Sequence, residues 1–104
     1  MTWWRWRRGR RKVGYPRVRF EVAGDLLVPR AWAAAGRTGP LEWSGLLERM
    51  SEGVSWSLEV AGTLTGTERR SGTAANQYAA ADECKSALRA VIDDHNALSD
   101  VPGG

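Results

Sequence analysis

The residues best suited to a chemical role lie in the first twenty positions, where tryptophan and arginine are interleaved. The candidate binding residues are Trp3, Trp4, Arg5, Trp6, Arg7, Arg8, Arg10, Arg11, Lys12, Arg17 and Arg19. On single-stranded nucleic acid, arginine pairs with phosphate while an indole ring stacks on a base, at about 1–3 kcal/mol per stacked base. We therefore expect this basic segment to contact nucleic acid or another polyanion.

The same composition leaves other partners open. On an anionic membrane, each cation near the surface contributes about 1 kcal/mol, and indole rings settle at the headgroup level. Dense like charge without a lasting period also predicts a flexible tail over residues 1–16. Such a tail could be an inert solubilising segment, or an upstream extension that results from a misassigned start of the protein. With an inert tail, the protein would be an interaction module whose acidic body or open sheet edge meets a protein partner.

Outside this segment, the sequence lacks a constellation typical of catalysis or metal binding. His95 is the only histidine, and without a metal-ligand spacing around it we expect it to pack at the end of a helix. Cys84 falls on an apolar stripe, which predicts a buried filler rather than a nucleophile. The adjacent acids Asp82-Glu83 and Asp93-Asp94 diverge by about 100° on a helix and cannot share one proton. We therefore predict no enzyme activity, no metal and no cofactor.

The charge is divided unevenly along the chain. Residues 1–20 contain eight of the 15 cations and none of the 12 acids, so the other 84 residues carry a net charge of −5. The basic character thus belongs to the N-terminal segment, and the predicted folded body is mildly acidic.

Length and composition predict one globular domain of 104 residues. No apolar run approaches the roughly 18 residues of a membrane-spanning helix, and the arginine pairs lack the apolar segment that follows them in an export signal. A single cysteine cannot form an intrachain disulfide. We therefore expect a cytoplasmic protein.

The rest of the chain is organised around a stretch that occurs twice. Residues 18–26 (VRFEVAGDL) return 38 residues later as residues 56–64 (WSLEVAGTL). Each stretch alternates apolar and polar residues up to a glycine, which predicts a half-buried strand running into a turn. Short return strands are expected over residues 26–28 and 63–65.

A helix is predicted after each pair of strands. In the first, over residues 40–52, the apolar residues Trp43, Leu46, Leu47 and Met50 have helical spacing. Residues 66–75 are rich in glycine, threonine and serine and predict a loop. The second helix, over residues 76–98, begins with Asn76 as its N-cap. Its predicted apolar face contains Tyr78, Ala81, Cys84, Leu88, Val91, Ile92 and His95.

The second unit resembles the small strand-strand-helix repeats of the YegP-like family, a group of bacterial proteins of unknown function. The residues that carry the resemblance are Trp56, Leu58, Val60, Gly62, Ser71, Tyr78, Leu88 and Val91. The match covers roughly residues 55–92, although the Asn-Gly turn and closing asparagine of the family are missing and the loop is longer. The resemblance implies a fold and a bacterial source, and it supplies no chemistry.

Together these patterns predict an α+β fold. Two strand-strand-helix units, residues 17–53 and 54–98, would form one antiparallel sheet with two helices on one face and Arg17 and Arg19 on the other. Residues 99–104 would be a flexible C-terminus. If the sheet stays open, its edges could pair in a homodimer.

Overall fold

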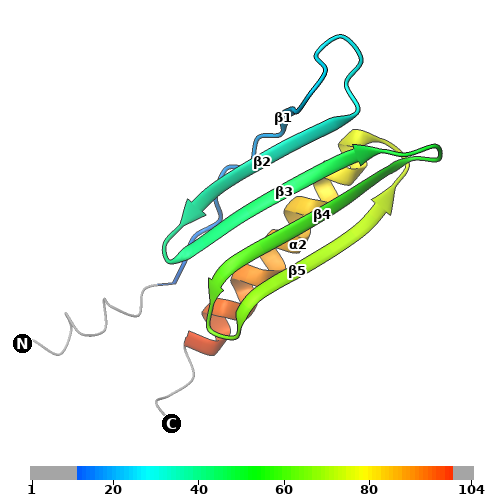
Figure 1. Cartoon of the computed structure of the whole chain (residues 1–104). Helices are drawn as coiled ribbons and strands as arrows, with labels where there is room; N and C mark the ends of the chain where they lie inside the picture. The colour runs from blue at the N-terminus through cyan, green and yellow to red at the C-terminus, as the bar shows by residue number, and fades with distance from the viewer. Residues whose placement is uncertain (1–11, 100–104) are drawn as a thin grey trace, which may run out of the picture.

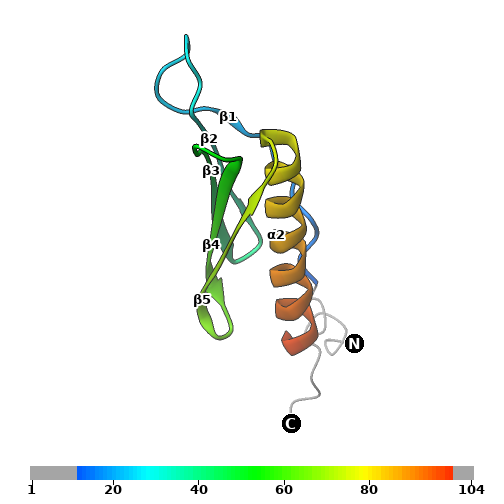
Figure 2. The same ribbon diagram turned by 90° about the vertical axis from the view of Figure 1, so that its right-hand side faces the viewer.

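The computed structural model describes residues 12–99, which form one antiparallel sheet and one long helix (Figure 1). The strands lie in the sheet in the order of the sequence. The elements are β1 (Glu21–Val22), β2 (Ala31–Thr38), β3 (Leu41–Arg49), β4 (Val54–Thr63), β5 (Gly66–Ala74) and α2 (Gln77–Ser99). The helix lies along one face of the sheet (Figure 2). The fold is α+β, with one helix instead of the two that the sequence predicted.

The helix predicted over residues 40–52 is in fact strand β3. Leu41, Trp43 and Leu47 are buried against the core and alternate with residues that are exposed or, at Leu46, half-buried. Met50, which completed the helical spacing, is 54% exposed. The chain enters β3 through a two-residue turn, Gly39-Pro40, between the paired residues 38 and 41. Gly39 has a φ of 58°, as the first position of a type II′ hairpin turn requires. This turn pairs β3 with β2 and therefore excludes a helix.

The shared tetrapeptide Glu-Val-Ala-Gly does not mark two equivalent units. Its glycines, Gly24 and Gly62, both adopt positive φ, 91° and 89°. The first copy nevertheless contributes only the two-residue strand β1, whereas the second lies at the end of the ten-residue β4. Residues 66–75, predicted to be a loop, contain β5. The prediction of two strand-strand-helix units is therefore wrong.

The return strand predicted over residues 26–28 is also absent. Leu26, Leu27 and Val28 are exposed by 76%, 92% and 51% in a loop that projects beyond the end of the sheet (Figure 1). The Leu27 amide donates to Oδ1 of Asp25 at 2.9 Å, and this contact favours a turn over strand pairing.

The second predicted helix is confirmed as α2. Asn76 caps it by accepting a hydrogen bond from the Ala79 amide at 2.9 Å. The buried residues of α2 are Ala80, Cys84, Leu88, Val91, Ile92 and His95. Tyr78 departs from the prediction, because it is 75% exposed. Within residues 12–99, no helix combines the length and hydropathy that a membrane-spanning segment needs.

Two tryptophans in the core lie over glycines on neighbouring strands. Trp43 is the register partner of Gly36, and Trp56 is the register partner of Gly72. A Cβ atom at either glycine would lie 2.7 Å from the facing indole, so only glycine leaves room for the ring. These tryptophans are buried in the core together with Trp32.

An extended segment lies on the face of the sheet where the sequence predicted a helix over residues 40–52. We call residues 12–20 the strap. It runs beside α2 (Figure 2), where the Val13 amide donates to Oδ1 of Asn96 at 2.8 Å and Asn96 Nδ2 donates to the Val13 carbonyl at 2.9 Å. Farther along, Val18 and Phe20 pack against the core. The strap therefore lies on the same face as the helix, and the prediction that Arg17 and Arg19 occupy the opposite face is wrong.

Candidate functional site

The strap presents a row of cations to solvent because it is extended. Successive side chains of an extended chain point to opposite sides. Val18 and Phe20 are partly buried against the core, while Arg17 and Arg19 between and beside them are exposed. The sequence alternation therefore fixes the outward direction of the arginines even though the residues form no long strand.

Between the strap and the first half of α2 lies a groove with a volume of about 360 Å³. We call it the strap groove. Its cations are Arg17 and Arg19 from the strap and Lys85 from the helix. Its apolar lining includes Phe20 and Trp32, and Tyr78 stands at the start of the helix. The groove thus combines positive charge with aromatic rings, which suits an anionic and partly aromatic ligand.

The three cations of the strap groove differ from other cations of the molecule in their partners. Among residues 12–99, no carboxylate forms an ion pair with Arg17, Arg19 or Lys85. By contrast, Arg37 pairs with Glu42, and Arg69 pairs with Glu59 at 3.3 Å. The charge of these three cations is therefore not offset by a neighbouring carboxylate, and the groove has a positive electrostatic potential that attracts an anionic ligand.

The end of the strap before the groove is tied to the helix by an aromatic contact. The Tyr15 hydroxyl donates to Oδ1 of Asp93 at 2.6 Å, and the Arg89 guanidinium lies 5.2 Å from the centroid of the Tyr15 ring. The hydrogen bond to Asp93 raises the pKa of Tyr15, because it stabilises the protonated phenol. Tyr15 and Arg89 therefore position the strap, and they are less available to a ligand than Arg17 and Arg19.

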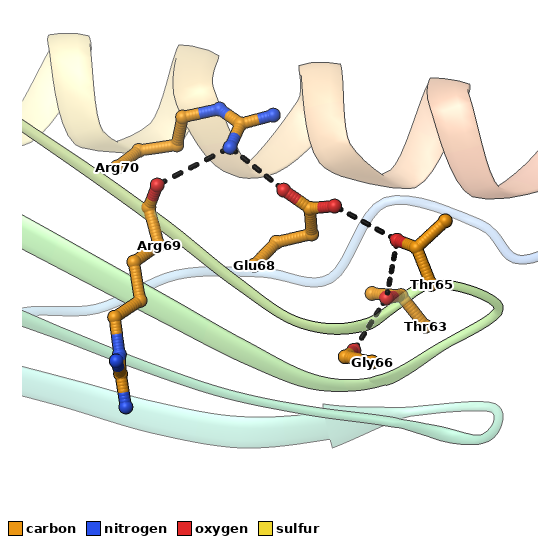
Figure 3. Close-up of polar contacts among 6 residues, drawn as sticks. All are labelled: Thr63, Thr65, Gly66, Glu68, Arg69 and Arg70. Atoms are coloured by element: carbon orange, nitrogen blue, oxygen red, sulfur yellow. Dashed lines mark hydrogen bonds and ion pairs between the residues drawn. The ribbon is translucent and has the colours of Figure 1, made fainter.

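A second cavity, of about 330 Å³, lies between the β4–β5 hairpin and the last turns of α2. On its wall, Arg70 Nη1 pairs with Oε2 of Glu68 at 2.8 Å, and Thr65 donates to Oε1 of the same carboxylate (Figure 3). The bond from Arg70, with a smaller contribution from Thr65, lowers the pKa of Glu68. Asp94 adds a second carboxylate to the lining, which contains one arginine. This cavity therefore disfavours a polyanion.

The residues weighed for catalysis occupy structural positions. Cys84 is buried, and desolvation raises the pKa of its thiol to about 11, which keeps it protonated at neutral pH. His95 packs at the end of α2, as predicted. Among residues 12–99, no group of three His, Cys, Asp or Glu side chains could coordinate a metal ion.

The structure places part of the predicted binding segment. Lys12, Arg17 and Arg19 are exposed on the strap, whereas the predicted binding residues from Trp3 to Arg11 lie outside the described residues. Sequence reasoning missed Lys85 and Tyr78 as members of the same surface. Their spacing of seven residues puts them on one side of a helix, but only the position of the strap shows that this side meets Arg17 and Arg19.

Comparison of the chain with protein-family models, with curated proteins and with solved structures found no match. The resemblance of residues 55–92 to YegP-like repeats therefore remains a prediction from the sequence.

Proposed function

We propose that this protein is a non-catalytic binding protein for nucleic acid or another polyanion, and that the strap and the basic segment before it form the interface. The observation that carries the proposal is the convergence of Arg17, Arg19 and Lys85 on one groove without carboxylate partners among residues 12–99. Phosphate contacts of this kind release counterions from the nucleic acid, which provides the main driving force of sequence-independent binding.

The sequence before the strap adds to this charge. Residues 1–20 contain eight cations and no acid, and Arg17 and Arg19 are the last two of that series. A polyanion that follows the chain from the groove toward the N-terminus would meet cations along its whole path. The acidic body of the protein would at the same time direct the ligand toward this segment.

A protein-interaction module is the second candidate. The exposed residues Leu26, Leu27 and Val28 favour it, because three consecutive aliphatic side chains in water are unusual without a partner. The free edge of β5 could also pair with a second copy of the chain, but its charged residues Glu68, Arg69 and Arg70 oppose edge-to-edge pairing. Neither feature explains why the cations of the strap groove gather without a carboxylate partner in the part of the chain that the structure describes.

The test compares two pairs of arginines in the full chain. The strap variant is R17Q/R19Q, and the control is R37Q/R69Q, which removes the same charge from arginines that are already in ion pairs. Binding of a labelled 20-nucleotide single strand is measured by fluorescence anisotropy over a range of salt concentrations. The strap variant should bind the single strand about ten-fold more weakly than the wild type does. The slope of the logarithm of the binding constant against the logarithm of the salt concentration should become less steep by about 1.4, whereas the affinity and slope of the control should change little.

Equal losses of affinity in R17Q/R19Q and R37Q/R69Q would show that binding depends only on net charge, and this result would contradict an interface on the strap. Vesicles of anionic lipid provide the remaining comparison. If the wild-type protein binds these vesicles and no oligonucleotide at low salt, the proposal is wrong and the membrane alternative replaces it. Binding that persists at high salt would instead favour a protein partner.

A further inference from the structure

Tyr78 occupies a position that core packing does not explain. It is the most exposed aromatic side chain among residues 12–99, although the buried Ala80 is only two residues farther along α2. It also lines the strap groove together with the cations Arg17, Arg19 and Lys85. An exposed aromatic ring beside cations that have no carboxylate partner within residues 12–99 suits the binding of an unstacked base, which stacks on the ring while its phosphates meet the cations.

The lining of the groove supports the same chemistry. Phe20 and Trp32 contribute ring surface, and the Arg49 guanidinium lies 5.6 Å from the centroid of the Trp32 ring. With a volume of about 360 Å³, the groove is at the small end of the range of ligand sites, enough for one planar group. The positive charges lie on the strap and helix sides of this apolar lining, where backbone phosphates would pass.

We propose that the strap groove binds single-stranded nucleic acid in preference to duplex, with one base stacked on Tyr78 and the flanking phosphates on Arg17, Arg19 and Lys85. This inference rests on the proposed function and specifies its ligand. A base in a duplex is already stacked and paired, so it could reach Tyr78 only at the cost of unpairing. A base in a single strand is free to leave its neighbours and stack on the tyrosine.

The experiment uses the full chain and two substitutions of one residue. Tyr78→Ala removes the ring, and Tyr78→Phe keeps it as a matched control. Because Tyr78 is exposed, neither substitution disturbs the core. Fluorescence anisotropy measures the binding of labelled dT20, labelled rU20 and a 20-base-pair duplex, and competition measures the binding of heparin, a polyanion without bases. The comparison of dT20 with rU20 shows which of these two single strands the protein prefers.

Tyr78→Ala should weaken the binding of the preferred single strand about 5- to 150-fold, while Tyr78→Phe binds as the wild type does. Binding of heparin should not change, since it depends on charge alone. The inference is overturned if Tyr78→Ala leaves single-strand binding unaltered or if the wild type binds duplex as tightly as both single strands. In those cases, a loss of affinity in R17Q/R19Q would still support polyanion binding, whereas no effect of either change would reject both proposals.

Discussion

Two elements cover the same face of the sheet, and they do so by different means. The helix α2 contributes Cys84, Leu88, Val91 and Ile92, all of them buried, and caps its own start with Asn76. The strap contributes only partly buried side chains, and hydrogen bonds to the helix fix its position. The helix therefore has a hydrophobic anchor along most of its length, whereas the strap depends on a few contacts.

This difference bears on where binding residues can lie. The cations of the proposed interface are on the strap and on the flank of α2 that meets it, where few apolar contacts are needed and side chains stay exposed. A weakly anchored segment can also open locally at low free-energy cost. Substitutions that weaken either α2 or the strap will measure how much each element contributes to the free energy of unfolding.

The largest loss of stability is expected for a substitution in α2. Leu88→Ala should lower the free energy of unfolding by about 2–5 kcal/mol, because Leu88 is fully buried and its truncation leaves a cavity. Urea denaturation followed by circular dichroism measures the change. The control is Leu98→Ala, since Leu98 is 48% exposed on the same helix and should cost well under half as much. Equal losses in the two variants would contradict the assignment of the helix stripe to the core.

An intermediate effect is expected where the strap meets the sheet. The Phe20 ring packs closely over Gly45: a Cβ at this glycine would be 3.1 Å from the Cys84 sulfur and 3.3 Å from the ring, so a larger residue would require these neighbours to shift by a few tenths of an ångström. Phe20→Ala should lower the free energy of unfolding by about 1–2 kcal/mol, less than Leu88→Ala, because the ring is only partly buried. Chemical denaturation gives the value, and Phe20→Leu serves as the conservative control. A loss of stability as large as that of Leu88→Ala would show that the strap is anchored to the sheet as firmly as α2 is.

The smallest effect is expected at the start of the strap. Asn96→Ala removes both hydrogen bonds to the Val13 backbone and should destabilise the fold by about 1 kcal/mol. Native-state hydrogen exchange provides the sharper measurement, since the Val13 amide should lose protection while the amides of β3 and β4 keep theirs. Ser86→Ala, an exposed position on α2, is the matched control. Loss of protection throughout the sheet would mean that the strap unfolds only together with the whole domain.

Local patterns in the sequence were sufficient for several features of the molecule. The long amphipathic stripe and Asn76 predicted α2, and the alternation around Val18 and Phe20 predicted which side chains of the strap face the core. These features depend on the periodicity of single segments and on a capping group that bonds its own helix. The uneven charge is likewise a property of the sequence, and it directed attention to the basic segment.

Other features depend on partners that are distant in the sequence. Residues 41–49 have both helical and alternating apolar spacing, and pairing with β2 and β4 on either side selected the strand. The glycines of both Glu-Val-Ala-Gly copies adopt positive φ, but the copies lie in different structures because β4 is paired on both sides and β1 pairs over two residues. No local pattern carries this information, because backbone hydrogen bonds in a sheet join residues according to the topology of the whole chain.

The candidate site also combines features that the sequence predicts with features that depend on the fold. The sequence by itself determined that Arg17 and Arg19 belong to a basic segment and that their side chains alternate with apolar ones. Only the tertiary structure brought Lys85 and Tyr78, more than 50 residues away in the chain, to the same groove. The physical reason is that burial of Val18 and Phe20 against the sheet forces the strap to lie beside α2, and the side chains on the facing flank of the helix then become its neighbours.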